Sequence, residues 1–437
     1  MNFAVRTLHG LALALAVGGS ALGASITDFC VFADQDVTLA QGTRVTGLVG
    51  SNDTMTIAGA AKPLLGMTGG GTLNVGTTVN SGGDIAFNGD VRIGGGTHVT
   101  GNVDAGGWII TGTTVKVTGN VTAGDGVSLG GGADVLGNVS AGGTLPVPDY
   151  AAGLSFNTGT TVQVYGDVIA NGDVSLGGSA KIHGNLTRTG GLSGGGTVLG
   201  TDTVVAGPIP VTPAVFTPVA VPGPTAVVVP GATDVTSSTS AGTPLLPGNY
   251  HDVILGSNRD LHLVSGVYEF NSIHAGGGFD LYLDLTGGPL TILVDDFIQV
   301  GTTMDVFIWD PGTAAYVKMG VATADPLLRA LAAQVFTEVH GPSQMGGGGE
   351  WFGTLFVPGD SATFGSSFAL TGSVYSGEAI RFANHIVINC AGTDRFEPLP
   401  SPGPGAYVPE PGTLLLIGVP VAGVILRRRR RNRRAAA

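Results

Sequence analysis

Acidic side chains in the second half of the chain are the residues best suited to chemistry on a polysaccharide. Glycosidases use two Asp or Glu residues around the scissile bond, and a nearby cation commonly completes such a site. The candidate set is Asp280, Asp284, Asp295 and Asp296, with Arg259 or Arg381 as the basic partner. Asp280 and Asp284 alternate with apolar residues, which is the spacing of the solvent-facing side of a strand. Because nothing in the sequence brings the four carboxylates together, we predict that the protein is not an enzyme.

The histidines are scattered along the chain. One of the eight, His9, lies in the first 24 residues, and the others are His98, His183, His251, His262, His274, His340 and His385. None of them belongs to an HExxH pattern, and the sequence contains no phosphate-loop or CxxC pattern. We therefore expect no cofactor. Calcium binding by the adjacent Asp295 and Asp296 stays an alternative that rests on their carboxylates alone.

The two cysteines, Cys30 and Cys390, stand at opposite ends of the central region. An even number of cysteines in an exported protein favours a disulfide, and their spacing fits no zinc site. We predict that Cys30 and Cys390 pair. Such a bond would place the first strand of the mature chain beside the last one.

The composition indicates an all-β protein. Of 437 residues, 76 are Gly, 43% are hydrophobic and only 11% are charged. A disordered chain has more charge and less apolar character, and a collagen needs Gly at every third position. Gly favours tight turns, whereas Val, Thr and Ile favour strands. The chain is therefore expected to form short strands joined by many tight turns.

An internal repeat sets the length of each strand-and-turn unit. A Gly-[Asn/Asp]-[Val/Ile/Leu] triplet recurs every 18 residues, at Gly83, Gly101, Gly119 and Gly137 and again at Gly166 and Gly184. An apolar residue stands two positions before most of these glycines, and Gly-rich corners separate the triplets. Eighteen residues accommodate three short strands, and stacked coils would bury each apolar face only against their neighbours. The repeat predicts a three-sided parallel β-solenoid over residues 25–205, interrupted by an insertion at 145–159.

Residues 36–205 resemble the bactofilin-like, polymer-forming type of β-helix. The segment GTRVTGLVGSN at 42–52 and the repeated GNV and GDV triplets carry the likeness. The resemblance implies a scaffold without an active site, and self-association through the exposed coil ends is the expected kind of assembly.

The second half of the chain begins after a Pro-rich segment. Residues 206–248 contain seven prolines from Pro208 to Pro230, which fix φ and remove donors, so this segment is expected to be an extended linker or a strap laid along the solenoid. Residues 249–400 alternate between apolar runs and Gly-rich turns and predict a second, solenoid-like β domain. Asp325, Pro326 and an apolar stripe beginning at Leu327 predict one flanking helix over 325–340.

The first 24 residues have the order of a secretory signal peptide. Arg6 precedes an apolar run at 8–17, and small residues follow up to Ala24. We expect cleavage near Ala24 and export of the mature chain.

The last residues, 401–437, combine a Pro-rich hinge, an apolar helix over 412–426 and a basic stop. The hinge carries Val408, Pro409, Glu410 and Pro411, and the stop carries Arg427, Arg428, Arg429, Arg430 and Arg431. This arrangement resembles the PEP-CTERM sorting signal. The resemblance implies recognition by an exosortase-type membrane protease, an inner-membrane intermediate held by the C-terminal transmembrane helix, and delivery to the surface or the exopolysaccharide matrix of a Gram-negative bacterium.

Charge excludes nucleic acid as a partner. The net charge is −12, and eight of the 19 basic residues lie in the two terminal segments, so the region between them is more acidic still.

We expect an exported structural or adhesive protein associated with exopolysaccharide or biofilm. Two alternatives stay open: a β-helix lyase or glycosidase, and a protein that binds an ordered surface such as ice. The second would use threonines near the corners, namely Thr97, Thr113, Thr114, Thr160 and Thr161, which form no regular ladder in the sequence.

Overall fold

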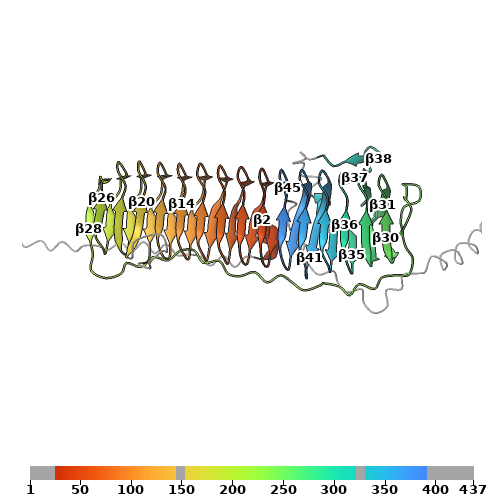
Figure 1. The fold of residues 1–437 in the computed structure, drawn as a ribbon. Coiled ribbons are helices and arrows are strands. Elements are labelled where there is room, and N and C mark those ends of the chain that lie inside the picture. The colour runs from red at the N-terminus through yellow and green to blue at the C-terminus, as the bar shows by residue number, and fades with distance from the viewer. Residues whose placement is uncertain (1–24, 144–152, 321–329, 391–437) are drawn as a thin grey trace, which may run out of the picture. The chain divides into compact units, whose positions relative to one another are not determined.

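The computed structural model describes residues 25–143, 153–320 and 330–390. These residues form a parallel β-solenoid with almost no helix, and the predicted fold class is confirmed to that extent (Figure 1). The coil length is confirmed as well, because Ile85 pairs with Val103 and Val103 pairs with Val121, each 18 residues further on.

In the first half, a complete coil contributes a strand to each of three faces, whereas two long strands of the second half, Glu350–Val357 and Ala369–Ser376, each run across two faces. One coil of the first half consists of β13 (Val103–Ala105), β14 (Ile109–Thr111) and β15 (Lys116–Val117). The alternating burial of these strands sends one side chain inward and the next outward. A short 3₁₀ turn, η1 (Ile26–Asp28), precedes the first strand, and Ser25 caps it.

The first face contains the strands that begin each coil. In chain order they are β1 (Phe29–Ala33), β4 (Leu48–Ser51), β7 (Gly66–Gly69), β10 (Asp84–Phe87), β13, β16 (Val121–Ala123), β19 (Val139–Ala141), β22 (Val168–Ala170), β25 (Leu186–Arg188), β28 (Asp202–Val204), β29 (Gly248–Asn249), β32 (Gly266–Phe270), β35 (Leu290–Val294), β39 (Val335–Val339), β41 (Glu350–Val357) and β43 (Ala369–Ser376).

The second face contains the strands that follow them. They are β2 (Val37–Leu39), β5 (Met55–Ile57), β8 (Leu73–Val75), β11 (Val91–Ile93), β14, β17 (Val127–Leu129), β20 (Leu154–Thr158), β23 (Asp173–Leu176), β26 (Leu192–Gly194), β30 (Asp252–Leu255), β33 (Ser272–Ala275), β36 (Ile298–Val300), β40 (Ser343–Met345), β42 (Ala362–Phe364) and β44 (Ile380–Phe382).

The third face contains the remaining strands, with β38 added antiparallel to β37. They are β3 (Arg44–Val45), β6 (Lys62–Pro63), β9 (Asn80–Ser81), β12 (His98–Val99), β15, β18 (Asp134–Val135), β21 (Gln163–Val164), β24 (Lys181–Ile182), β27 (Thr197–Val198), β31 (Asp260–Val264), β34 (Asp280–Asp284), β37 (Asp305–Asp310), β38 (Ala315–Lys318) and β45 (Val387–Asn389).

The two halves of the chain form one stack of coils. The last coil pairs with the first on all three faces, through Val31 with Val374, Val37 with Ile380 and Arg44 with Val387. Winding therefore starts in the middle of the stack, proceeds to β28 at one end, and resumes at the other end with β29 (Figure 1). One apolar core runs through both halves, from Cys30 to Ile388.

The Pro-rich segment lies along the first face. Asn52, Asn88 and Asn171 each form two hydrogen bonds with its backbone, at Val219, Phe216 and Ile209 respectively. The Phe216 ring, 2% exposed, packs in a second apolar cluster with Phe29, Phe32 and Tyr375. This segment, residues 206–230, is called the strap below.

The helix predicted over 325–340 is wrong in its second half. Residues 335–339 form strand β39, which pairs with β35 and β41, while residues 321–329 lie outside the described part. The apolar residues that suggested a helical stripe include Val335 and Val339, whose β-branched side chains point into the core. Pairing with two neighbouring strands outweighs the local helix signal.

At one corner, successive coils have a residue with left-handed backbone conformation at the equivalent position. Ala60, Thr78, Thr114, Thr161 and Ser179 have φ between 58° and 61°. Gly42, Gly96 and Gly132 occupy the equivalent position in the other coils, with φ between 71° and 73°. Glycine tolerates this conformation without strain, which explains the Gly-rich corners of the repeat.

Candidate functional site

The outer side of the third face carries a ladder of carboxylates. Asp280 of β34 lies opposite Asp260 of β31 on one side and Asp305 of β37 on the other. Adjacent strands are about 4.8 Å apart, so the three side chains follow one another along the stack. Asp280 and Asp284 do point outward, because Leu281 and Leu283 between them are buried.

Burial and mutual repulsion act on these acids. Burial, and then the charges of Asp305 and Asp260, raise the pKa of Asp280, while Lys318 opposes that shift. The Lys318 ammonium lies 2.5 Å from Asp305 Oδ2. Burial raises the pKa of Glu350, at the start of β41, to about 7, and Lys318 partly offsets this. Its Oε2 atom has no hydrogen-bond partner among the described residues.

A column of stacked rings runs beside the carboxylates. The rings of His262 and Tyr282 are 4.1 Å apart and those of Tyr282 and Phe307 are 4.5 Å apart, both nearly parallel, and Tyr316 of β38 meets the column edge-on. Burial lowers the pKa of His262. Each ring covers the face of its neighbour, so the column stabilises this surface and leaves little ring face for stacking on a sugar.

The other predicted acids lie elsewhere. Asp295 and Asp296 occupy the turn after β35, where Asp295 Oδ1 is 3.5 Å from His340 Nδ1. His340 Nε2 is in turn 3.0 Å from Oε1 of the buried Glu338, which also accepts a hydrogen bond from the strap residue Thr225. This chain of contacts fastens the strap. The four aspartates predicted from the sequence are therefore divided between two places.

The basic residues predicted as partners are also separated. Arg381 lies on β44 of the second face, opposite Thr38 and Thr363. Arg259 precedes β31 and contacts the ladder through its carbonyl oxygen, which accepts a hydrogen bond from the Asp280 amide. Among the described residues, Lys318 is the cation that contacts the carboxylate ladder, and no pattern in the sequence pointed to it.

Cys30 and Cys390 form a disulfide, with Cα atoms 5.5 Å apart. The bond lies where the two runs of coils meet, since Cys30 belongs to β1 and Cys390 follows β45. Gly47 passes so close to both residues that a Cβ atom there would lie 2.1 Å from the Cys390 sulfur. The strand pairs and the disulfide thus join the first and last coils together.

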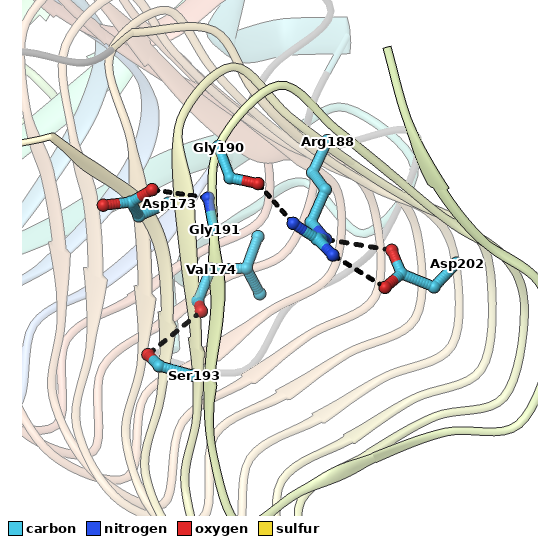
Figure 2. Close-up of polar contacts among 7 residues, drawn as sticks. All are labelled: Asp173, Val174, Arg188, Gly190, Gly191, Ser193 and Asp202. Atoms are coloured by element: carbon cyan, nitrogen blue, oxygen red, sulfur yellow. Dashed lines mark hydrogen bonds and ion pairs between the residues drawn. The ribbon is translucent and has the colours of Figure 1, made fainter.

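The end of the stack at β28 is open in the described part of the chain. Strands β26, β27 and β28 pair only with the preceding coil, through β23, β24 and β25. Figure 2 shows the contacts that hold this last coil: Arg188 binds both carboxylate oxygens of Asp202 at 2.9 Å, and Asp173 accepts from the Gly191 amide. Leu192, Leu199 and Val204 are all exposed there. An unpaired strand edge with apolar neighbours can accept further strands.

A ladder of Asn and Asp side chains explains the middle residue of the repeated triplet. The Asn102 side-chain oxygen accepts from the Asn120 amide and that of Asn120 from the Asn138 amide, both at 2.9 Å. Asp84 and Asp167 hold equivalent positions. The fixed 18-residue period of Asn or Asp was the sequence signal, and it marks a structural contact between coils.

The corner threonines form no continuous ladder. Thr114 and Thr161 hold the left-handed corner, but Gly96 and Gly132 replace threonine in the neighbouring coils. Thr97 is buried, and its hydroxyl donates to the Gly76 carbonyl.

The predicted signal peptide and the sorting tail, including the Val408–Pro411 motif and the Arg427–Arg431 cluster, lie outside the described residues. So does the predicted apolar helix 412–426. Over the residues that are described, no helix has the length and apolar character of a membrane span.

Comparisons with known proteins leave the family open. No protein-family model matches the chain, and no curated protein matches it. Among solved structures, the chain is similar to an ice-binding protein from an Antarctic bacterium of the Flavobacteriaceae, with 12% identity, 83% of this chain and 96% of that chain covered, and a TM-score of 0.21. A TM-score this low carries no argument about function.

Proposed function

We propose that the protein is an exported structural and adhesive component of the cell surface or the extracellular matrix, associated with exopolysaccharide. The observation that carries the proposal is the disulfide between Cys30 and Cys390, which closes the junction between the first and last coils. Disulfides form and persist in oxidising compartments outside the cytoplasm. The predicted signal peptide and sorting tail support the same destination.

Sorting would follow the route that the C-terminal tail implies. An apolar helix followed by an arginine cluster would hold the chain in the inner membrane, and an exosortase-type protease would act at the Pro409–Glu410–Pro411 hinge. The acidic region between the termini disfavours nucleic acid and anionic lipid surfaces as partners.

Self-association through the open end of the stack would account for the structural role of the protein. Within the described part of the chain, strands β26–β28 pair with neighbours on one side only, and Leu192, Leu199 and Val204 are exposed beside their free edges. The opposite end differs, because residues 231–247 cover it: the Gly231 amide donates to the Tyr250 carbonyl, and Val235 bridges to Val253. Two copies meeting through their open ends would extend the sheets of all three faces and bury Leu192, Leu199 and Val204.

The experiment places a positive charge at the open end. Leu192→Lys with Leu199→Lys should abolish assembly of the mature chain, measured by sedimentation velocity, because like charges would meet across the contact. Leu65→Lys is the matched control, since Leu65 is 63% exposed in the first half of the chain, far from β26–β28 in sequence. A mature wild-type chain that remains monomeric at high concentration would contradict assembly through this end.

A matrix-retention assay tests the adhesive role separately. Exopolysaccharide from the producing organism should retain the wild-type chain on a column. Equal passage of the protein through the polymer column and a blank column would contradict the association with polysaccharide.

A further inference from the structure

The covered end of the stack brings three side chains with metal-binding atoms together. Asp234 belongs to the segment that covers this end, and His251 and Asp252 belong to the coil beneath it. Among the described residues, this is the group whose His and carboxylate ligand atoms all lie within 4.8 Å of one another. None of the acids singled out from the sequence is part of it.

The distances match those between ligands of one small divalent ion. His251 Nδ1 lies 2.9 Å from Asp234 Oδ1 and 3.1 Å from Asp252 Oδ2. Zinc-type ions bind nitrogen and oxygen at about 2.0–2.2 Å, so two ligands at a right angle stand about 3 Å apart and two at a tetrahedral angle about 3.4 Å apart. The two distances from His251 Nδ1 are therefore close to those between neighbouring ligands of one ion, and the two carboxylate atoms lie within 4.8 Å of each other.

The neighbours of Asp252 orient its carboxylate for this purpose. Its Oδ1 atom accepts hydrogen bonds from Asn271 Nδ2 at 2.9 Å and Ser272 Oγ at 2.7 Å. These bonds hold Oδ1 and leave Oδ2 facing His251. Outer hydrogen bonds of this kind fix the geometry of metal ligands.

The group is open to solvent on its outer side. About half of each of the Asp234 and His251 side chains is exposed. Three protein ligands with free positions for water are a common arrangement for Zn²⁺ and its neighbours in the first transition row.

We propose that Asp234, His251 and Asp252 bind one divalent transition-metal ion, of the Zn²⁺ class, and that the ion ties the covering segment to the first coil of the second half. An imidazole nitrogen among the ligands favours this class over Ca²⁺ and Mg²⁺, which prefer oxygen alone. The ion would act on the end of the stack opposite the open one, so this site is independent of assembly through β26–β28.

The test is calorimetric titration of ZnCl₂ into the mature full-length chain, purified without a histidine tag and freed of metal by a chelator. We expect one ion per chain. His251→Gln and Asp234→Asn should each weaken binding at least tenfold, and Asn271→Ala about tenfold through the outer shell. Titration with CaCl₂ should give at least tenfold weaker binding.

His183→Gln is the matched control, because His183 also contacts a polar side chain, Gln163, but belongs to no group of possible metal ligands among the described residues. This variant should bind Zn²⁺ like the wild type. Each variant is checked for an unchanged circular dichroism spectrum, so that weaker binding reports the site. No binding by the wild type, or equal binding by wild type and His251→Gln, would overturn the proposal and leave the direct contacts of His251 with the two carboxylates as the account of this group.

Discussion

The sulfur atoms of Cys30 and Cys390 join residues that are 360 positions apart in the chain. The same junction pairs Val31 with Val374 through the backbone. Covalent and hydrogen-bonded contacts therefore connect the start of the first half to the end of the second.

Removing this disulfide should destabilise the protein. The double variant Cys30→Ala/Cys390→Ala frees a very long loop in the unfolded chain, so its free energy of unfolding should fall by about 2–5 kcal/mol. Urea unfolding measures the change. Wild-type protein in a strong reductant should behave like the double variant, and a midpoint that is insensitive to reductant would contradict a stabilising bond.

At the left-handed corner, replacing a residue by glycine and replacing a glycine by alanine should change the stability of the protein in opposite directions. Ala60→Gly should stabilise the protein by about 0.5–1 kcal/mol, since Ala60 has φ of 60° and glycine carries no penalty there. Gly96→Ala, in the same column, should destabilise it by about 1 kcal/mol. A Cβ atom at Gly96 would meet Thr78 Cγ2 only at an ordinary contact distance of 3.4 Å, so the effect isolates the backbone. Thermal midpoints that move in the same direction for both variants would argue against this explanation.

Glu350 should make stability fall as pH rises. Its pKa is about 7 in the folded protein, above the ordinary value of 4.5, so the folded state holds a proton that the unfolded state releases between these two values. The resulting stabilisation is complete below about pH 4.5 and is lost as pH rises through 7, with a size of about 3 kcal/mol. Glu350→Gln should therefore raise the melting temperature relative to wild type more at pH 8 than at pH 5. An equal difference at both pH values would show that Glu350 titrates normally.

The Asn88 side chain should hold the strap in place at Phe216. Its side chain accepts from the Phe216 amide and donates to the Phe216 carbonyl, both at 2.8 Å. Asn88→Ala removes both bonds, at about 1 kcal/mol each, and should speed hydrogen exchange at the Phe216 amide by roughly tenfold or more. Asn102→Ala is the matched control, because the Asn102 side chain bonds to the next coil and not to the strap. Equal exchange at Phe216 in both variants would contradict the assigned role.

Prediction from the sequence succeeded where the coil length is constant. The triplets beginning at Gly101 and Gly119 place Val103 and Val121 at the start of successive first-face strands, both buried. In the second half, Asp260, Asp280 and Asp305 also pair in sequence, but the steps are 20 and 25 residues. Without a fixed period, the register and therefore the carboxylate ladder could not be read from the sequence.

Contacts between residues far apart in the sequence account for the remaining features that the sequence analysis did not predict. The pairing of β1 with β43 uses ordinary strand residues such as Val31 and Val374, which carry no signal of their partner. Residues 335–339 have an apolar pattern that a helix or a strand could bury, and only the neighbouring strands β35 and β41 select the strand. The Asp234–His251–Asp252 group depends in the same way on how the covering segment folds back.

The most direct test of the proposed function is intact-mass analysis of the protein from fractionated cells of the producing organism. The account predicts that the chain is found at the surface or in the matrix, begins near Ser25, ends near the Val408–Pro411 motif and contains the Cys30–Cys390 disulfide. A full-length chain with two free thiols, recovered from the cytoplasm, would contradict it.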